Sequence, residues 1–200
     1  STASITVAGF HTIDRWYTTI TTAGTWTQTQ STDVPTGQGF RNSIKMDCTT
    51  ADASLAAGDR LMLSYRIEAY DVQRFKKGTA TAEKYAISFW VKGTKTGTHI
   101  LEIYDHDNGR HICQAYTVDT TNTWEQKNLI FAADTTGEIA NDNGRGMELQ
   151  FYMAAGTTYT SGTLATSWAA TVSNTRAVGQ VNSADSTSND FLITGLQMEV

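Results

Sequence analysis

The run Leu61-Met62-Leu63-Ser64-Tyr65-Arg66-Ile67-Glu68-Ala69-Tyr70 decides the fold class of this chain. Its odd positions all carry apolar or aromatic side chains, whereas Ser64, Arg66 and Glu68 stand at even positions. Successive side chains of a strand point to opposite faces of a sheet, so a period of two is typical of a strand with one buried and one wetter face. The sequence therefore predicts a β-strand over residues 61–70.

The same period of two recurs along most of the chain. It is clear over residues 85–92, 147–153 and 192–200, and shorter over residues 5–7, 24–29, 43–48, 99–104, 112–117 and 124–131. Turns rich in glycine and asparagine separate these runs, among them Asp107-Asn108-Gly109, which is typical of a β-hairpin because both residue types tolerate a positive φ. No segment keeps the 3.6-residue apolar stripe of a helix, and at most one helical turn is expected, over residues 51–57. The sequence predicts an all-β fold, a two-sheet antiparallel jelly-roll β-sandwich with almost no helix.

Size, composition and charge narrow the class of protein. The 200 residues suffice for one sizeable core and show no internal boundary, so we expect a single domain over residues 1–200. The net charge is −5 and the basic residues form no stripe, so neither nucleic acid nor a membrane is expected as a partner. The chain begins Ser1-Thr2-Ala3 without a start methionine, and we expect it to be a piece of a longer protein.

The two cysteines are too few for a disulfide framework. Cys48 lies in phase with Ile44 and Met46, which is typical of a small buried apolar residue. A disulfide with Cys113 is open but not required, and we expect both thiols to be dispensable for folding.

The segment Asp105-His106-Asp107-Asn108-Gly109 has the most metal-like pattern in the chain. Alternate aspartates before a glycine resemble the start of a calcium loop, but no third ligand and no closing glutamate follow. We interpret the segment as a polar hairpin tip, with calcium binding as the alternative. The four histidines lack the spacing of zinc ligands, and no phosphate-binding loop is present, so we expect no metal site and no cofactor.

Carboxylates on the predicted strands raise the question of catalysis. Glu68, Glu102 and Glu148 could face a cleft, and a glycosidase needs two carboxylates beside the scissile bond. A wet strand face carries carboxylates by default, however, and the chain has no nucleophile elbow. We expect that the protein is not an enzyme.

Outward aromatic side chains are better candidates for function. Sugar recognition stacks an aromatic plane on the apolar face of a pyranose, while charged and amide side chains bind the hydroxyls. The candidate carbohydrate-binding residues, all expected opposite the core positions of their strands, are Trp90, Tyr152, Arg66, Glu68, Tyr70 and Gln150. The alternative is that loops bury both faces of such strands, in which case Trp90 belongs to the core.

Six short motifs in a fixed order span nearly the whole chain. They are Asp14-Arg15-Trp16, Ile67-Glu68-Ala69-Tyr70, Ser88-Phe89-Trp90-Val91-Lys92, Thr123-Trp124-Glu125, Ala155-Gly156-Thr157-Thr158-Tyr159 and Ile193-Thr194-Gly195-Leu196-Gln197-Met198-Glu199-Val200. In this order they resemble a family of phage tail-fibre and virion structural domains. The third and fourth motifs also resemble bacterial carbohydrate-binding modules of the galactose-binding-like sandwich type. Ala69 departs from the family pattern, which usually has glycine there.

The resemblance implies a location in the virion, on a tail or capsid appendage, where the domain would bind host cell-surface polysaccharide or another receptor. It also implies contacts with other virion proteins and a homo-oligomer, with a trimer favoured because phage fibres are mostly three-fold. Because virions assemble in a reducing cytoplasm, it implies reduced cysteines. The alternative function is a purely structural capsid-decoration or fibre-assembly domain without a ligand.

Overall fold

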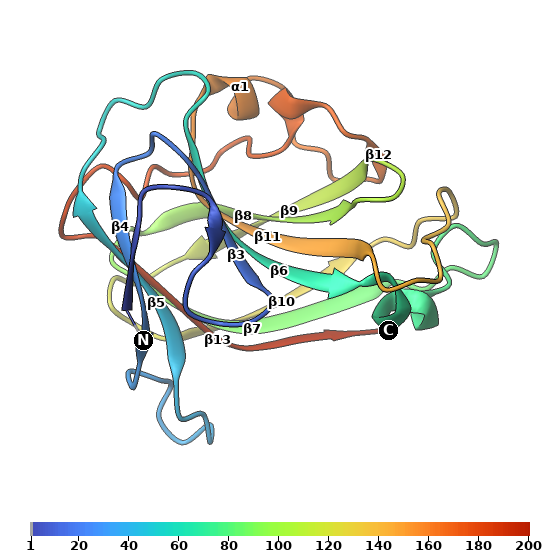
Figure 1. Ribbon diagram of the computed structural model, residues 1–200, viewed down its shortest axis with the longest axis horizontal. Coiled ribbons are helices and arrows are strands. Elements are labelled where there is room, and N and C mark those ends of the chain that lie inside the picture. Colours follow the sequence, from blue (N-terminus) through green and yellow to red (C-terminus); the bar gives the residue numbers. More distant parts are fainter. Residues whose placement is uncertain (1) are drawn as a thin grey trace.

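The computed structural model describes residues 2–200 and folds them into two antiparallel sheets that face each other (Figure 1). The six-stranded sheet has the order β1-β4-β5-β13-β7-β10, and the seven-stranded sheet has the order β12-β9-β8-β11-β6-β3-β2. The strands are β1 (Thr2–Ile5), β2 (Gly9–Phe10), β3 (Trp16–Thr21), β4 (Thr25–Ser31), β5 (Ser43–Thr50), β6 (Arg60–Glu68), β7 (Tyr85–Gly93), β8 (Gly97–Asp105), β9 (Arg110–Val118), β10 (Glu125–Phe131), β11 (Arg145–Ala155), β12 (Ala169–Ala170) and β13 (Asp190–Glu199). The predicted jelly-roll β-sandwich is confirmed.

The main core lies between the two sheets and follows from the period of two. Along β7 the buried positions alternate strictly with half-buried ones, and Phe89 is fully buried. Its ring meets Phe151 of β11 in the opposite sheet edge-on, with 5.1 Å between the ring centroids. Both sheets thus contribute their apolar faces to one shared cluster, and burial of that area is the main stabilising contribution to the fold.

Helical structure is sparse, as predicted, but it does not lie where the sequence indicated. Residues 51–57 form bends and a turn rather than a helical turn. The predicted strand over residues 61–70 ends at Glu68, and a 3₁₀ helix, η1 (Ala69–Phe75), follows it. The other helices are α1 (Thr157–Thr160) and η2 (Ser173–Thr175). Within residues 2–200, no helix has the length and apolar character needed to cross a membrane.

The cysteines lie in different clusters and are not joined. Cys48 belongs to the main core, as its phase with Met46 indicated. Cys113 belongs to a second cluster on the other side of the seven-stranded sheet, and its thiol is free. The chain is therefore folded without a disulfide.

Candidate functional site

The outer face of the seven-stranded sheet brings together four of the polar residues that the sequence singled out or considered. Arg66 of β6 pairs with Glu148 of β11, and Gln150 follows two residues along the same strand. On the other side of β11, Tyr104 lies beside Glu148 and Glu102 lies beside Gln150. Because alternate residues of adjacent strands share a face, these side chains form one continuous polar array.

The segment 156–182 covers one end of this outer face. It contains α1, β12 and η2, and in Figure 1 it arches in orange and red over β8, β9 and β11. Under it lies the second apolar cluster, formed by Met62, Ile100, Cys113, Tyr152 and Ala177. The other end of the outer face stays open, and we call it the open face, defined by Phe10, Tyr17, Arg66, Tyr104, His106, Arg145 and Glu148.

Tyr152 is a correction to the sequence analysis, which placed it on a wetter outward face. It does point away from the main core, but the covering segment buries it completely. Its hydroxyl donates a hydrogen bond of 3.1 Å to Glu102. In this structure Tyr152 therefore offers no surface on which a sugar ring could stack.

A buried ion pair fastens the covering segment to the sheet. Arg176 follows η2 and donates hydrogen bonds to both oxygens of Glu102, at 2.9 Å and 3.1 Å from Nε. It also donates to Gln150 at 2.8 Å, and His111 contacts Glu102 at 2.7 Å. Burial alone would raise the pKa of Glu102, but Arg176 and His111 outweigh it and lower that pKa below its usual range.

Glu148 is the centre of a second group of charges, on the open face. Arg66 forms an ion pair with it at 2.5 Å, Arg145 donates a hydrogen bond to it at 2.9 Å, and Gln150 donates another at 2.6 Å. Burial would raise the pKa of Glu148, but hydrogen bonds from His106 and Gln150 and the charge of Arg66 lower it to about 2. The carboxylate stays ionised and holds its neighbours in fixed positions.

Aromatic rings flank this charged group. Phe10 is 57% exposed and packs edge-on against Tyr17, with 5.1 Å between the ring centroids. The Arg66 guanidinium lies over the Tyr17 ring, 3.5 Å from its centroid. Tyr104 packs edge-on against His106 on the other side, at 4.6 Å between centroids. None of these four rings was among the predicted binding residues. Phe10 and Tyr17 lie outside the alternating runs of the sequence, and His106 was considered only as a metal ligand.

Ser64 adds an unused polar group to the same face. It lies between Tyr17 and Gln150 in the sheet register, and it is fully buried. Among the described side chains, its hydroxyl is one of few buried groups without a hydrogen-bond partner. A buried hydroxyl without a partner costs free energy, which a bound water or ligand group would recover.

The remaining predicted site residues lie apart from one another. Glu68 ends β6, pairs with Arg15 at 3.5 Å, and lines a cavity of about 360 Å³ whose wall also includes Phe10, Arg66 and Arg145 of the open face. Tyr70 is on η1 rather than on the strand, so it does not share the face of Arg66 as predicted, although it is exposed. Trp90 is half-buried on the outer face of the six-stranded sheet, so it cannot contact the same small ligand as Arg66.

The hairpin at residues 106–109 favours the polar-tip interpretation over the calcium loop. Asp105 is fully buried, and it forms an ion pair with Lys77 at 2.5 Å. Its other oxygen accepts hydrogen bonds from the backbone N–H groups of Asp107 and Asn108. Of residues 106–109 only Gly109 has a positive φ, so the turn is longer than the two-residue type that the sequence indicated.

One further group has ligand atoms close enough to bind a metal ion: Glu102, His111 and Cys113 lie within 4.8 Å of one another. Metal binding there requires a thiolate, but burial and the charge of Glu102 raise the pKa of Cys113 far above its usual range. Arg176 already neutralises Glu102 as well. These contacts favour a structural role for the three residues.

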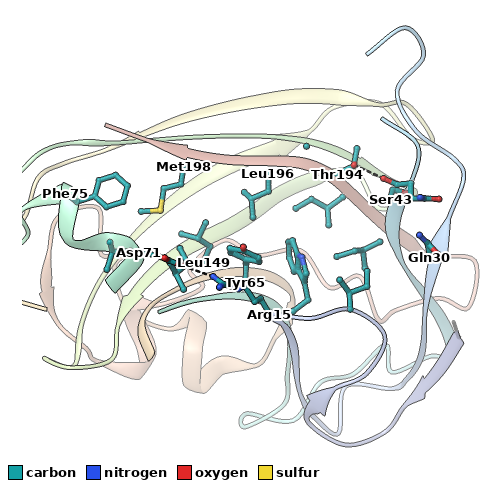
Figure 2. A pocket seen from close by; sticks show the side chains of 18 of the residues that line it. Arg15, Gln30, Ser43, Tyr65, Asp71, Phe75, Leu149, Thr194, Leu196 and Met198 are labelled. Carbon is teal, nitrogen blue, oxygen red and sulfur yellow. Dashed lines mark hydrogen bonds and ion pairs between the residues drawn. The ribbon is translucent and has the colours of Figure 1, made fainter. Parts of the chain in front are cut away.

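A separate cleft of about 570 Å³ opens between the two sheets (Figure 2). Its wall includes Leu196 and Met198 of β13, and Leu149 lies across from them in the opposite sheet. The Arg15 side chain reaches over to Asp71 of η1, with 2.8 Å between Nη1 and Oδ2. This inter-sheet cleft lies beside the main core and is distinct from the open face.

Comparisons with known proteins were made on sequence and on structure. No protein-family model and no curated protein sequence matches the chain. The fold is shared. The enzymatically active domain of Bacteriophage CBA120 tailspike protein 4 is 15% identical with a TM-score of 0.48, and the match covers 92% of this chain but 19% of that chain. The family 11 carbohydrate-binding module from Clostridium thermocellum, in complex with a mixed-linked tetrasaccharide, is 12% identical with a TM-score of 0.44 over 92% of this chain and 88% of that one.

The module TmCBM61 in complex with β-1,4-galactotriose is 11% identical with a TM-score of 0.43, covering 93% of this chain and 88% of that chain. At such identities, and with TM-scores below 0.5, the likeness supports no statement about what this chain does. The ligands named for these proteins assign no ligand to this chain.

Proposed function

We propose that this chain is a non-catalytic carbohydrate-binding domain of a phage virion appendage, and that the open face holds the sugar. The observation that carries the proposal is the exposed ring of Phe10 beside a fixed array of charged and amide groups. An aromatic plane supports the apolar face of a pyranose, and arginine, glutamate and glutamine side chains bind its hydroxyls. Both kinds of group lie next to each other on this face.

The array is preorganised, which favours binding. Arg66 is held between Glu148 and the Tyr17 ring, and Arg145 is held by Glu148 and His106. Side chains that are already ordered lose little conformational entropy when a ligand binds. Sugar hydroxyls still have to give up water, so we expect a dissociation constant near the millimolar scale, about −4 kcal/mol, for one domain.

The charges of the carboxylates support binding rather than hydrolysis. A glycosidase needs a carboxylic acid that is protonated near neutral pH, which requires a raised pKa. On the outer face of the seven-stranded sheet, the pKa values of Glu102 and Glu148 are both lowered by basic partners. Neither group can donate a proton to a leaving group near neutral pH.

The virion part of the proposal rests on the ordered motifs, from Asp14-Arg15-Trp16 to the end of β13. A tailspike protein and carbohydrate-binding modules are also among the proteins of similar fold. Several copies in a homo-oligomer, with a trimer favoured, would raise the avidity for a host polysaccharide by roughly 10²–10⁴ over one site.

A glycan microarray followed by calorimetry with the best glycan tests the proposal. We expect Phe10→Ala and Arg66→Ala to weaken binding at least tenfold, and Val7→Ala, a change at another exposed apolar residue, to leave it unchanged. If Trp90→Ala abolishes binding and Phe10→Ala leaves it unchanged, the sugar site lies on the six-stranded sheet instead. If no glycan binds to the oligomeric protein, the purely structural function takes the place of this proposal.

A further inference from the structure

The six-stranded sheet lacks a strand beside the second half of β13. β13 pairs with β5 only from Asp190 to Ile193, because β5 begins at Ser43. Beyond Ile193 it keeps β7 on one side, with a break in register between Thr194 and Gln197, and among residues 2–200 no strand pairs with it on the other side. In Figure 1, β13 runs on towards the C-terminus well past the start of β5.

The inter-sheet cleft occupies the place of this missing strand. It begins at Asn42 and Ser43, where the chain turns away from the sheet, and it extends along β13 to Met198. Figure 2 shows that the side chains of Leu196 and Met198 point from β13 into the cleft, towards Leu149 of the opposite sheet. Both β13 side chains are only half-buried, although they pack against the main core.

The free edge of β13 presents backbone hydrogen-bonding groups to the cleft. The carbonyl oxygen of Met198 accepts a hydrogen bond of 2.9 Å from the Arg74 side chain, so it points towards η1 and away from β7. In an antiparallel strand the N–H and C=O of one residue point to the same side, so the Met198 N–H points there too. A strand edge of this kind is a ready template for pairing with another chain.

We propose that the cleft accepts an extended segment of another polypeptide as an added strand, collinear with β5 and antiparallel to β13. Its main chain would pair with β13 over residues 196–199, beyond the contact between Thr194 and Asn42, and its alternate apolar side chains would enter the cleft. Main-chain hydrogen bonds supply affinity in this mode of binding, and pockets for alternate side chains supply specificity. Four residues of strand correspond to about 13 Å.

The direction of β5 sets the polarity of the added strand, and the charge of Arg74 then indicates which residue its amino end should carry. Arg15 is paired with Asp71, whereas the exposed Arg74 has the Met198 carbonyl as its hydrogen-bond partner. A strand collinear with β5 would have its amino end near η1, because β5 starts at Ser43 and runs away from the cleft. The occupant should therefore carry an acidic residue at its amino end, facing Arg74.

The test uses the peptide acetyl-Asp-Ile-Thr-Leu-Thr-Val-amide and the same peptide with N-methyl groups on the backbone amides of isoleucine, leucine and valine. We expect the first peptide to slow amide hydrogen exchange at Leu196 and Met198 when added at millimolar concentration. Residues that enter the cleft beside Met198 are the ones whose N–H groups face β13, so the N-methylated peptide cannot donate these main-chain hydrogen bonds and should give no protection. In the protein, Leu196→Glu should weaken binding more than tenfold, and Arg74→Gln should weaken it about two- to fivefold.

Phe10→Ala, on the open face, should bind the peptide as the wild type does, which separates this proposal from the carbohydrate site. Equal binding of the two peptides, or binding that Leu196→Glu does not weaken, would place the peptide elsewhere and overturn the proposal. The proposal would also be overturned if the peptide gives no protection and if selection from a displayed library of random heptapeptides does not enrich sequences with alternating apolar residues.

Discussion

The ion pair between Arg176 and Glu102 offers a sharp test of how the covering segment is held. Replacing Arg176 by methionine keeps most of the apolar stem and removes the guanidinium that contacts both oxygens of Glu102. Glu102 is fully buried, and removing one partner of a buried ion pair costs about 3–5 kcal/mol. His111 and Tyr152 still contact Glu102, so we expect the lower value, about 3 kcal/mol. For a chain of this size, that lowers the Tm by about 6–12 °C.

The pH dependence of that loss identifies its cause. In the wild type the pKa of Glu102 is lowered, so its contribution to stability is present above the unfolded-state pKa and disappears as the pH falls through the folded-state value. Without Arg176, burial dominates and raises the pKa of Glu102. The charged carboxylate then lowers the free energy of unfolding of the variant at neutral pH, and protonation of Glu102 at lower pH removes this loss. The difference between the two proteins should therefore be large at about pH 7 and smaller at about pH 4.

Urea unfolding at both pH values measures this difference, with Arg41→Met as the matched change at an exposed arginine, expected to alter the free energy of unfolding by less than about 0.5 kcal/mol. A loss below about 1 kcal/mol for Arg176→Met, or the same loss at both pH values, would refute the reasoning.

Four further outcomes are expected. The Cys48→Ala, Cys113→Ala double variant should fold, and reductant should leave the Tm of the wild type unchanged, because the thiols are free; a Tm lowered by reductant would contradict this. Gly195→Ala should lower the free energy of unfolding by about 1–3 kcal/mol, because φ is 63° and a Cβ would lie 2.5 Å from the Phe40 ring. Glu148 has a lowered pKa, so the stability that it contributes is lost as the pH falls towards about 2; acid titration of unfolding should therefore be steeper for the wild type than for Glu148→Gln. Light scattering on the domain with its native neighbours should give a homo-oligomer, and a monomer at high concentration would count against the trimer.

The fold was predictable from sequence because its strands are long and alternate regularly, as β7 does. The placement of the sheets was not, because strand neighbours such as β13 and β5 are far apart in the chain. Trp90 and Tyr152 have the same phase in their strands, yet they lie on the outer faces of different sheets. A period of two shows which side chains point outward but not to which sheet a strand belongs, so Trp90 and Tyr152 were wrongly assigned to one binding face.

The covering segment explains most of what the sequence analysis missed at the site. Nothing in the polar loop around Arg176 signals that it reaches Gln150 and Glu102 across the sheet. The end of β6 had a readable signal, because the buried residues Ala69, Val72 and Phe75 are three apart, a helical spacing. The outward placement of Arg66 was predictable because this residue lies in the middle of the clearest alternating run.

The two buried thiols lie in different parts of the fold, so their rates of alkylation report local opening of those parts separately. Cys113 lies under the segment 156–182, and Ala165 in that segment accepts a hydrogen bond from the Cys113 backbone N–H at 2.7 Å. Cys48 is enclosed by the main core between the sheets. Alkylation of Cys113 in native buffer would report the lifting of that segment, whereas alkylation of Cys48 would report movement around Ala184, whose carbonyl oxygen lies 4.0 Å from the Cys48 Sγ. The ratio of the two labelling rates thus compares how often the covering segment opens with how often the structure around Cys48 opens.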